Sequence, residues 1–131
     1  MTYKILVVDD SSTMRSLLVS TLEDLGSFEI EETASGFEAL KLLARQKPDL
    51  IITDINMPDI NGLELVSFVK RNPLTKAIPL IIVTTERSDR DREKGLELGA
   101  EEYLAKPFEP RVLQQLVVKH LRLARDAATR G

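Results

Sequence analysis

Short apolar segments alternate with longer amphipathic segments along the chain. The most apolar short segments are ILVV at 5–8, DLIITD at 49–54 and IPLIIVTT at 78–85. FEIEE at 28–32 and EEYLAKP at 101–107 are shorter or more polar, but they are also typical of strands. A strand covered on both faces is apolar throughout. We therefore expect the first three segments in the centre of a sheet and 28–32 as an outer strand.

The longer segments repeat apolar residues at three-and-four spacing, which predicts helices. The first helix is expected to begin at Ser11 or Ser12, whose side chains are available to cap it, and to end at Gly26. The other helices are expected at about 36–46, 63–71 and 89–98, and from about 110 onward. Five strands alternating with five helices predict right-handed crossovers, and so an α/β fold with a mostly parallel sheet between helices. Residues 124–131 are expected to be a fraying helix end or the start of a linker.

Composition narrows the class of protein. The 131 residues fit one domain, and 43% hydrophobic and 30% charged residues are ordinary for a soluble globular protein. A net charge of −3 argues against binding nucleic acid through bulk charge. The chain has no cysteine, which excludes disulfides and thiolate metal sites. The apolar run in the N-terminal segment MTYKILVVDD is too short for a signal peptide, because two aspartates follow it directly. No stretch of the sequence approaches the ~18 consecutive apolar residues that a membrane span needs. We expect a soluble cytoplasmic protein that binds neither membrane nor, directly, nucleic acid.

Carboxylates follow two of the apolar strands. Asp9 and Asp10 come directly after the first, and Asp54 follows the third. Functional groups of an open parallel sheet gather at the carboxyl ends of strands, so these side chains are expected in one crevice. A single Asp there is usually a helix cap or turn former, but three together repel one another unless positive charge is present. Oxygen ligands of this kind suit Mg²⁺, and no nearby histidine or cysteine indicates zinc.

Two further groups belong to the same edge of the predicted sheet. Thr84 ends the fourth strand, and Lys106 follows the fifth. A lysine is usually a solvated surface residue, but this one lies between a short strand and a proline, where its ammonium can offset the acidic cluster. A hydroxyl, an ammonium, a divalent cation and a carboxylate nucleophile are the groups needed to transfer a phosphoryl group to an aspartate.

Four segments closely resemble the receiver domain of two-component response regulators, both in their sequences and in their order and spacing along the chain. They are VVDDS, TDINMPDINGLEL, PLIIVTT and YLAKPF. The resemblance covers about residues 4–122. DDSSTMR at 9–15 and the short C-terminus are most similar to the small single-domain chemotaxis type. The resemblance implies a doubly wound (βα)5 flavodoxin-like fold, with a five-stranded parallel sheet of order 2-1-3-4-5 flanked by five helices. Residues 1–131 would then form a single receiver domain.

The resemblance also implies a phosphoacceptor and a metal site. Asp54 would be the phosphoacceptor. Asp10 would bind Mg²⁺ directly and Asp9 largely through water, and the backbone carbonyl of Asn56 would complete the protein ligands. Asp54, as the acceptor, would belong to the same metal site. The motif positions show no substitution that would indicate a degenerate receiver.

The remaining motif residues would bind the phosphoryl group and respond to it. Thr84 would hydrogen-bond the group, and Lys106 would form an ion pair with it. Tyr103 would be an aromatic switch that turns inward when Thr84 moves toward the phosphate. The family further implies a cis peptide bond between Lys106 and Pro107 that directs the lysine into the site.

The function implied is a phosphorylation-controlled binding module. It would take a phosphoryl group from the phosphohistidine of a sensor histidine kinase or histidine phosphotransfer domain, with Mg²⁺, onto Asp54. It would catalyse only its own phosphorylation and dephosphorylation. A downstream protein would bind the last two helices and the fifth strand, where residues 86–94 are either a solvated helix face or part of the signalling surface. Polar residues at Asn56 and Glu86, which flank the site, favour rapid hydrolysis.

Two other functions compete with this interpretation. A Mg²⁺-dependent phosphohydrolase with an aspartyl-phosphate would place a second acid two residues after its nucleophile. Here those positions are Ser11 after Asp9 and Asn56 after Asp54. Turnover of a generic phosphate monoester would favour that enzyme. A flavin-binding module would hold phosphate in a hydroxyl- and glycine-rich loop, whereas this loop begins with two carboxylates. A yellow purified protein would favour it, and no glycine-rich nucleotide fingerprint is present.

Overall fold

The computed structural model describes the backbone of residues 2–86 and 88–130, and the side chains of the same residues up to Arg122. Within these ranges five parallel strands form one sheet in the order β2-β1-β3-β4-β5, and five helices alternate with them. The elements are β1 Tyr3–Val8, α1 Ser12–Leu25, β2 Phe28–Thr33, α2 Gly36–Arg45, β3 Leu50–Thr53, α3 Gly62–Arg71, β4 Leu80–Thr84, α4 Asp89–Leu98, β5 Glu102–Ala105 and α5 Pro110–Arg130. The predicted fold class and strand order are confirmed, with the three most apolar strands inside and β2 at an edge.

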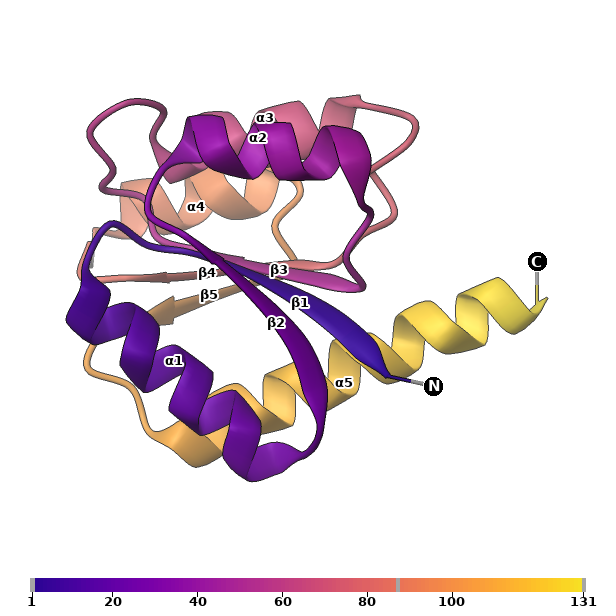
Figure 1. Cartoon of the computed structure of the whole chain (residues 1–131). Coiled ribbons are helices and arrows are strands. Elements are labelled where there is room, and N and C mark those ends of the chain that lie inside the picture. The colour runs from indigo at the N-terminus through magenta and orange to yellow at the C-terminus, as the bar shows by residue number, and fades with distance from the viewer. Residues whose placement is uncertain (1, 87, 131) are drawn as a thin grey trace.

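The sheet lies between two layers of helices, with α2, α3 and α4 on one face and α1 and α5 on the other (Figure 1). Alternate residues of each strand point to opposite faces, so the inner strands supply two separate clusters. In β1, Leu6 and Val8 belong to the cluster beneath α2 and α3, whereas Ile5 and Val7 belong to the cluster over α1 and α5. A strand that serves two clusters needs an apolar residue at every position, which explains the continuous apolar segments.

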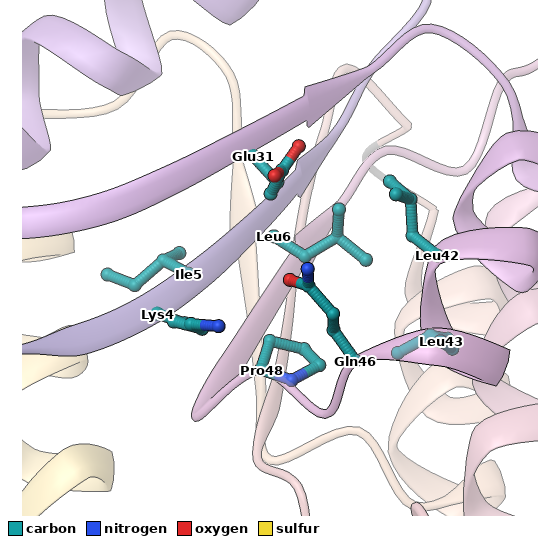
Figure 2. A pocket seen from close by; sticks show the side chains of 8 residues that line it. All are labelled: Lys4, Ile5, Leu6, Glu31, Leu42, Leu43, Gln46 and Pro48. Carbon is teal, nitrogen blue, oxygen red and sulfur yellow. The ribbon is translucent and has the colours of Figure 1, made fainter.

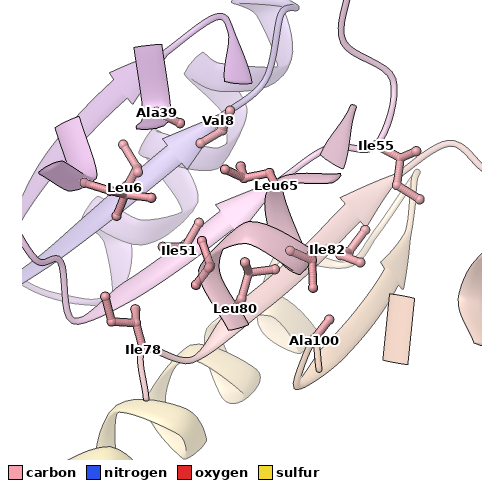
Figure 3. Close-up of a cluster of buried hydrophobic side chains, with 13 residues drawn as sticks. Leu6, Val8, Ala39, Ile51, Ile55, Leu65, Ile78, Leu80, Ile82 and Ala100 are labelled. Carbon is pink, nitrogen blue, oxygen red and sulfur yellow. The ribbon is translucent and has the colours of Figure 1, made fainter. Parts of the chain in front are cut away.

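Figure 3 shows the cluster on the α2–α4 face, where Ala39 of α2 and Leu65 of α3 pack with Leu6, Ile51 and Ile82 of the inner strands. Each of these residues is at most 2% exposed. Burying a side chain of the size of Leu or Ile contributes about 1.5–3 kcal/mol. The buried strands therefore fix the positions of their own carboxyl ends, where the polar residues lie.

The predicted bounds differ from the observed ones by one or two residues at several ends. The clearest case is β4, which begins at Leu80 and not at Ile78. The N–H of Ile78 bonds to the carbonyl of Thr75 in a turn at 3.0 Å, and Pro79 has no N–H to offer a neighbouring strand. At the other end of the chain the backbone of 124–130 continues α5, while its side chains and Gly131 lie outside the described residues.

Polar side chains start four of the helices just after the carboxyl ends of strands. The N-cap residues are Ser11 for α1, Ser35 for α2, Asn61 for α3 and Ser88 for α4, and each accepts a hydrogen bond from a backbone N–H at 2.9–3.2 Å. Such a cap satisfies one of the free N–H groups of a first turn. The connections before α1, α2 and α4 are at most four residues long, whereas eight residues separate β3 from α3.

The chain's two ends leave the sheet on the side away from these loops. Figure 1 shows the start of β1 and the last turns of α5 on the right, whereas the loop from β1 to α1 is on the left. Of the helices that the structure describes, none combines the length and apolar character needed to cross a membrane.

Gly62 permits a close contact between α3 and the end of β3. Its N–H donates to the carbonyl oxygen of Ile55 at 2.8 Å. A Cβ at this position would lie 2.0 Å from the carbonyl oxygen of Asp54 and 2.8 Å from the Cα of Ile55. Because these atoms belong to backbone that is tied to the sheet, they cannot move aside without displacing Asp54.

We expect Gly62→Ala to lower the free energy of unfolding by about 1–3 kcal/mol, the usual cost of overpacking. Urea denaturation followed by circular dichroism measures this loss. Gly26→Ala is the matched control, since its added Cβ meets only the Phe28 ring at 4.0 Å and its backbone is extended, with φ 168°. Equal stability of the two variants would contradict the close contact.

Candidate functional site

Three carboxylates meet at the carboxyl edge of the sheet. Asp9 and Asp10 follow β1 and Asp54 follows β3, and these strands are neighbours with Val8 in register with Thr53. One oxygen of each carboxylate lies within 4.8 Å of the others. Asp9 and Asp54 are buried and Asp10 is exposed. The predicted convergence of the three acids is confirmed.

Backbone N–H groups hold one oxygen of each buried carboxylate. The Oδ1 atom of Asp9 accepts from the N–H of Ser11 at 2.9 Å. The Oδ1 atom of Asp54 accepts from the N–H groups of Ile55 at 2.6 Å and Asn56 at 3.3 Å. These bonds orient both carboxylates, so that their Oδ2 atoms face a common partner.

That partner is the ammonium of Lys106. Its Nζ lies 2.9 Å from Oδ2 of Asp9 and 3.1 Å from Oδ2 of Asp54, and the lysine is 7% exposed. The backbone N–H of Lys106 donates to the carbonyl of Thr84 at 2.7 Å, which extends the pairing of β5 with β4. The Lys106–Pro107 peptide bond is cis, as expected. The lysine therefore belongs to the acidic cluster and is not a solvated surface residue.

Glu86 connects several of the other predicted site residues. Its backbone N–H donates to Oγ1 of Thr84 at 3.3 Å, and its carbonyl accepts from the hydroxyl of Tyr103 at 2.7 Å. Its side chain accepts from Nδ2 of Asn56 at 2.9 Å. Asn56 and Glu86 were expected to flank the site, and the structure shows in addition that they contact each other.

The environment of Tyr103 strongly favours the neutral phenol. The pKa of Tyr103 is raised to about 12. Burial is the largest cause, and the negative charges of Asp91, Glu86 and Asp54 add to it. The hydroxyl therefore keeps its proton over the whole physiological range and remains a hydrogen-bond donor to the carbonyl of Glu86. The ring packs beside the hydrophobic cluster on the α2–α4 face.

Two residues near the site carry no signal in the sequence. Arg15 donates from Nη1 to the backbone carbonyl of Asp9 at 2.6 Å, and its Nε lies 3.6 Å from Oε1 of Glu32. Asp59 accepts hydrogen bonds from the N–H groups of Gly36 and Phe37 in the first turn of α2. Both contacts join residues whose spacing along the chain follows no helical or strand period, so only the tertiary structure reveals them.

A small cavity beside the sheet is separate from this site. It is lined by Lys4 and neighbouring residues of β1, by Glu31 of β2 and by residues from Leu42 to Pro48 (Figure 2). Its volume is about 20 Å³, room for about one water molecule. It lies along the first half of β1, whereas the carboxylates follow the end of that strand. It is too small for a cofactor.

The acidic cluster fits a bound metal ion. Within the described residues, the exposed carboxylate of Asp10 has no hydrogen-bond or ion-pair partner, although it lies within 4.8 Å of two other carboxylates. Such an arrangement of like charges is costly without positive charge beyond that of Lys106. Carboxylate oxygens are ligands for hard cations. The three acids are thus able to hold a metal ion.

Comparison with known proteins agrees with this geometry. The model of the response regulator receiver domain matches residues 5–118. The chain belongs to this family. Receiver domains are phosphoacceptors that work between histidine kinases and downstream targets, so this chain is a signalling module rather than an enzyme that turns over a separate substrate. The resemblance stated from the sequence is confirmed.

Similar proteins include chemotaxis regulators. Chemotaxis protein CheY1 of Helicobacter pylori is 44% identical over 113 residues, which are 86% of this chain and 91% of that protein. The structure of the chemotaxis response regulator CheY4 of Vibrio cholerae has a TM-score of 0.83 and 37% identity over 92% of this chain and 99% of that one. The Mn²⁺-bound form of response regulator Rcp1 has a TM-score of 0.77 and 29% identity, and 88% of each chain is covered.

We expect Lys106→Met to destabilise the metal-free receiver by about 3–5 kcal/mol, because it leaves two buried carboxylates without their counter-charge. Urea denaturation in the presence of EDTA measures the loss. The control is Lys119→Met, which removes a 57% exposed side chain 3.1 Å from Glu102 and should cost about 0–1 kcal/mol. Similar losses for the two variants would contradict a structural role for the buried ammonium.

Proposed function

We propose that Asp54 accepts a phosphoryl group from a phosphohistidine, in a reaction that requires Mg²⁺, and that phosphorylation changes the surface formed by α4, β5 and α5. The observation that carries the proposal is the convergence of Asp9, Asp10, Asp54 and Lys106 at one edge of the sheet. The donor would be a sensor histidine kinase or a histidine phosphotransfer domain.

In this reaction an oxygen of the Asp54 carboxylate attacks phosphorus and the P–N bond of the donor breaks. The electron pair of that bond leaves with the imidazole nitrogen. The N–H groups of Ile55 and Asn56 hold Oδ1 of Asp54, and this fixes the direction in which Oδ2 faces. Lys106 contacts Oδ2 and would form an ion pair with the phosphoryl group. Transfer of this kind depends mainly on positioning and on neutralising charge.

Asp9, Asp10, Asp54 and the backbone carbonyl of Asn56 would hold the metal. Support for Mg²⁺ comes from the donor set, which consists of oxygen atoms with an exposed side through which waters can complete the coordination. When bound, the ion would neutralise the carboxylates and phosphoryl oxygens. The structure of the similar response regulator Rcp1 is of a Mn²⁺-bound form, which supports a divalent ion as the metal.

The contacts of Glu86 support a route from the site to the binding surface. Thr84 would hydrogen-bond the phosphoryl group, and its hydroxyl already accepts the N–H of Glu86. The carbonyl of the same residue accepts from Tyr103. A shift of Thr84 would therefore act through Glu86 on Tyr103, the proposed switch, which lies on β5. Phosphorylation would bias this element between two states rather than create a new fold.

Two broader features belong to the proposal. Residues 4–122 would form the core of a receiver domain that spans 1–131, which is supported by the family match over 5–118. The protein would work in the cytoplasm with its kinase. Its similarity to the CheY chemotaxis proteins supports this location.

We expect acetyl phosphate with Mg²⁺ to add one phosphoryl mass to the wild-type protein, seen by mass spectrometry of the intact chain. Asp54→Asn removes the nucleophile and should show no such gain. EDTA should abolish the gain in the wild type. An equal gain in wild type and Asp54→Asn would overturn the assignment of the acceptor, and turnover of a generic phosphate monoester would favour the phosphohydrolase instead.

We expect the double variant Asn56→Leu, Glu86→Leu to lose the phosphoryl group more slowly than wild type. The two side chains hydrogen-bond each other beside Asp54, where they can orient an attacking water. Loss of one such hydrogen bond, about 1 kcal/mol, predicts roughly a fivefold slower rate. Decay of the phosphorylated protein after removal of acetyl phosphate measures it, with exposed Glu97→Leu as control. Equal rates for all three proteins would disprove the idea.

A further inference from the structure

The loop at 55–61 is held by its own Asp59 as well as by its contacts with Asp54. Its Asp59 reaches the first turn of α2, more than twenty residues earlier in the chain. Oδ1 of Asp59 accepts from the N–H of Gly36 at 3.2 Å, and Oδ2 accepts from the N–H of Phe37 at 3.0 Å. One carboxylate from a neighbouring loop thus satisfies two of the free N–H groups at the start of this helix.

The hydrogen bonds to the Asp59 carboxylate favour its charged form. The N–H groups of Phe37 and Ile60 contribute most to lowering the pKa of Asp59, to about 2, and that of Gly36 adds to them. The side chain is therefore ionised throughout the physiological range. A negative charge at the N-terminus of a helix is favoured by the partial positive charge there.

The packing below the carboxylate also requires close approach. Gly36 has no side chain, and a Cβ at this position would lie 2.8 Å from both the Cβ and the carbonyl oxygen of Ile60. The backbone of the loop therefore rests directly on the first residue of α2. Asp59 and Gly36 act together: one supplies the hydrogen bonds and the other the space.

At its other points the loop is tied to the site and to α3. Oδ1 of Asp54 accepts from Ile55 and Asn56 at the loop's start, and Gly62 donates to the carbonyl of Ile55 at its end. Asn61 caps α3. Between Asn56 and Asn61, the loop is held by the bonds from Asp59 to α2, by the contact of Ile60 with Gly36, and by Met57, which packs against the cluster on the α2–α4 face.

We propose that Asp59 is a positioning residue for the metal site: by clamping the 55–61 loop onto α2, it holds the carbonyl of Asn56 where a metal ligand is needed. The inference rests on the proposed function, which makes that carbonyl a ligand. A residue that only caps α2 would stabilise the helix without affecting the metal, and the chain offers a control that separates the two roles. Ser35 is the N-cap of the same helix, and its hydroxyl, the group that the control variant removes, accepts a hydrogen bond from the N–H of Glu38 at 3.0 Å.

The test compares Asp59→Ala, Asp59→Asn and Gly36→Ala with Ser35→Ala in the full chain. The first readout is amide hydrogen exchange of metal-free protein in EDTA. Asp59→Ala and Gly36→Ala should speed exchange in the 55–61 loop, whereas Ser35→Ala should speed it only within α2. This readout involves neither metal nor phosphoryl transfer, so it tests the clamp itself.

The second readout is the Kd for Mg²⁺ from calorimetric titration. Residues that orient metal ligands typically change affinity about 10- to 100-fold, and we expect about tenfold weaker binding for Asp59→Ala. Asp59→Asn keeps one acceptor oxygen and should show a smaller loss. Ser35→Ala should bind as the wild type does.

Two failures are distinguishable. If wild-type protein binds Mg²⁺ and is phosphorylated on Asp54, but Asp59→Ala matches Ser35→Ala in loop exchange and in Kd, the positioning role is overturned while the proposed function stands. If wild-type protein neither binds Mg²⁺ nor gains a phosphoryl group, the proposed function fails, and with it the role of Asp59 toward the metal.

Discussion

The ammonium of Lys106 makes this arrangement of the sheet edge possible. Asp9 and Asp54 come from adjacent strands and are both buried, and two like charges in such a place are unfavourable unless an opposite charge lies between them. The lysine lies near the other end of the chain. It reaches the acids because β5 pairs with β4 and because its own N–H continues that pairing to the carbonyl of Thr84. The two buried carboxylates therefore gain their ammonium partner only once the outermost strand β5 has joined the sheet.

The residues around this charge cluster form a continuous set of short contacts. Thr84, Glu86 and Tyr103 are joined through the backbone of Glu86, and Asn56 joins them through its side chain. The backbone of Glu86 uses both its donor and its acceptor for these contacts, so a change at one partner alters the geometry available to the other. The hydroxyl of Tyr103 stays protonated because burial and neighbouring carboxylates raise its pKa to about 12, and the contact does not depend on pH in the physiological range.

The apolar pattern was sufficient to predict the strands, the central position of β1, β3 and β4, and the edge at which Asp9, Asp54, Thr84 and Lys106 meet. This works because continuous burial and strand-end position are local properties of the chain. The full strand order came from the resemblance to receiver domains. The bonds from Asp59 to α2 and from Arg15 to the carbonyl of Asp9 could not be predicted, since they depend on how two loops approach each other. The predicted start of β4 was two residues too early for a similar reason, because Ile78 is apolar and buried but takes part in a turn.

The direction in which the chain's ends leave the sheet has a practical consequence. The start of β1 and the last turns of α5 lie on the side away from the acidic edge (Figure 1). A fluorescent protein or an affinity tag joined at either end would sit far from Asp54 and would leave the approach to it open. Paired fluorophores at the two ends would in turn report little on the edge itself, so a reporter of phosphorylation is better placed in the loops that follow the strands.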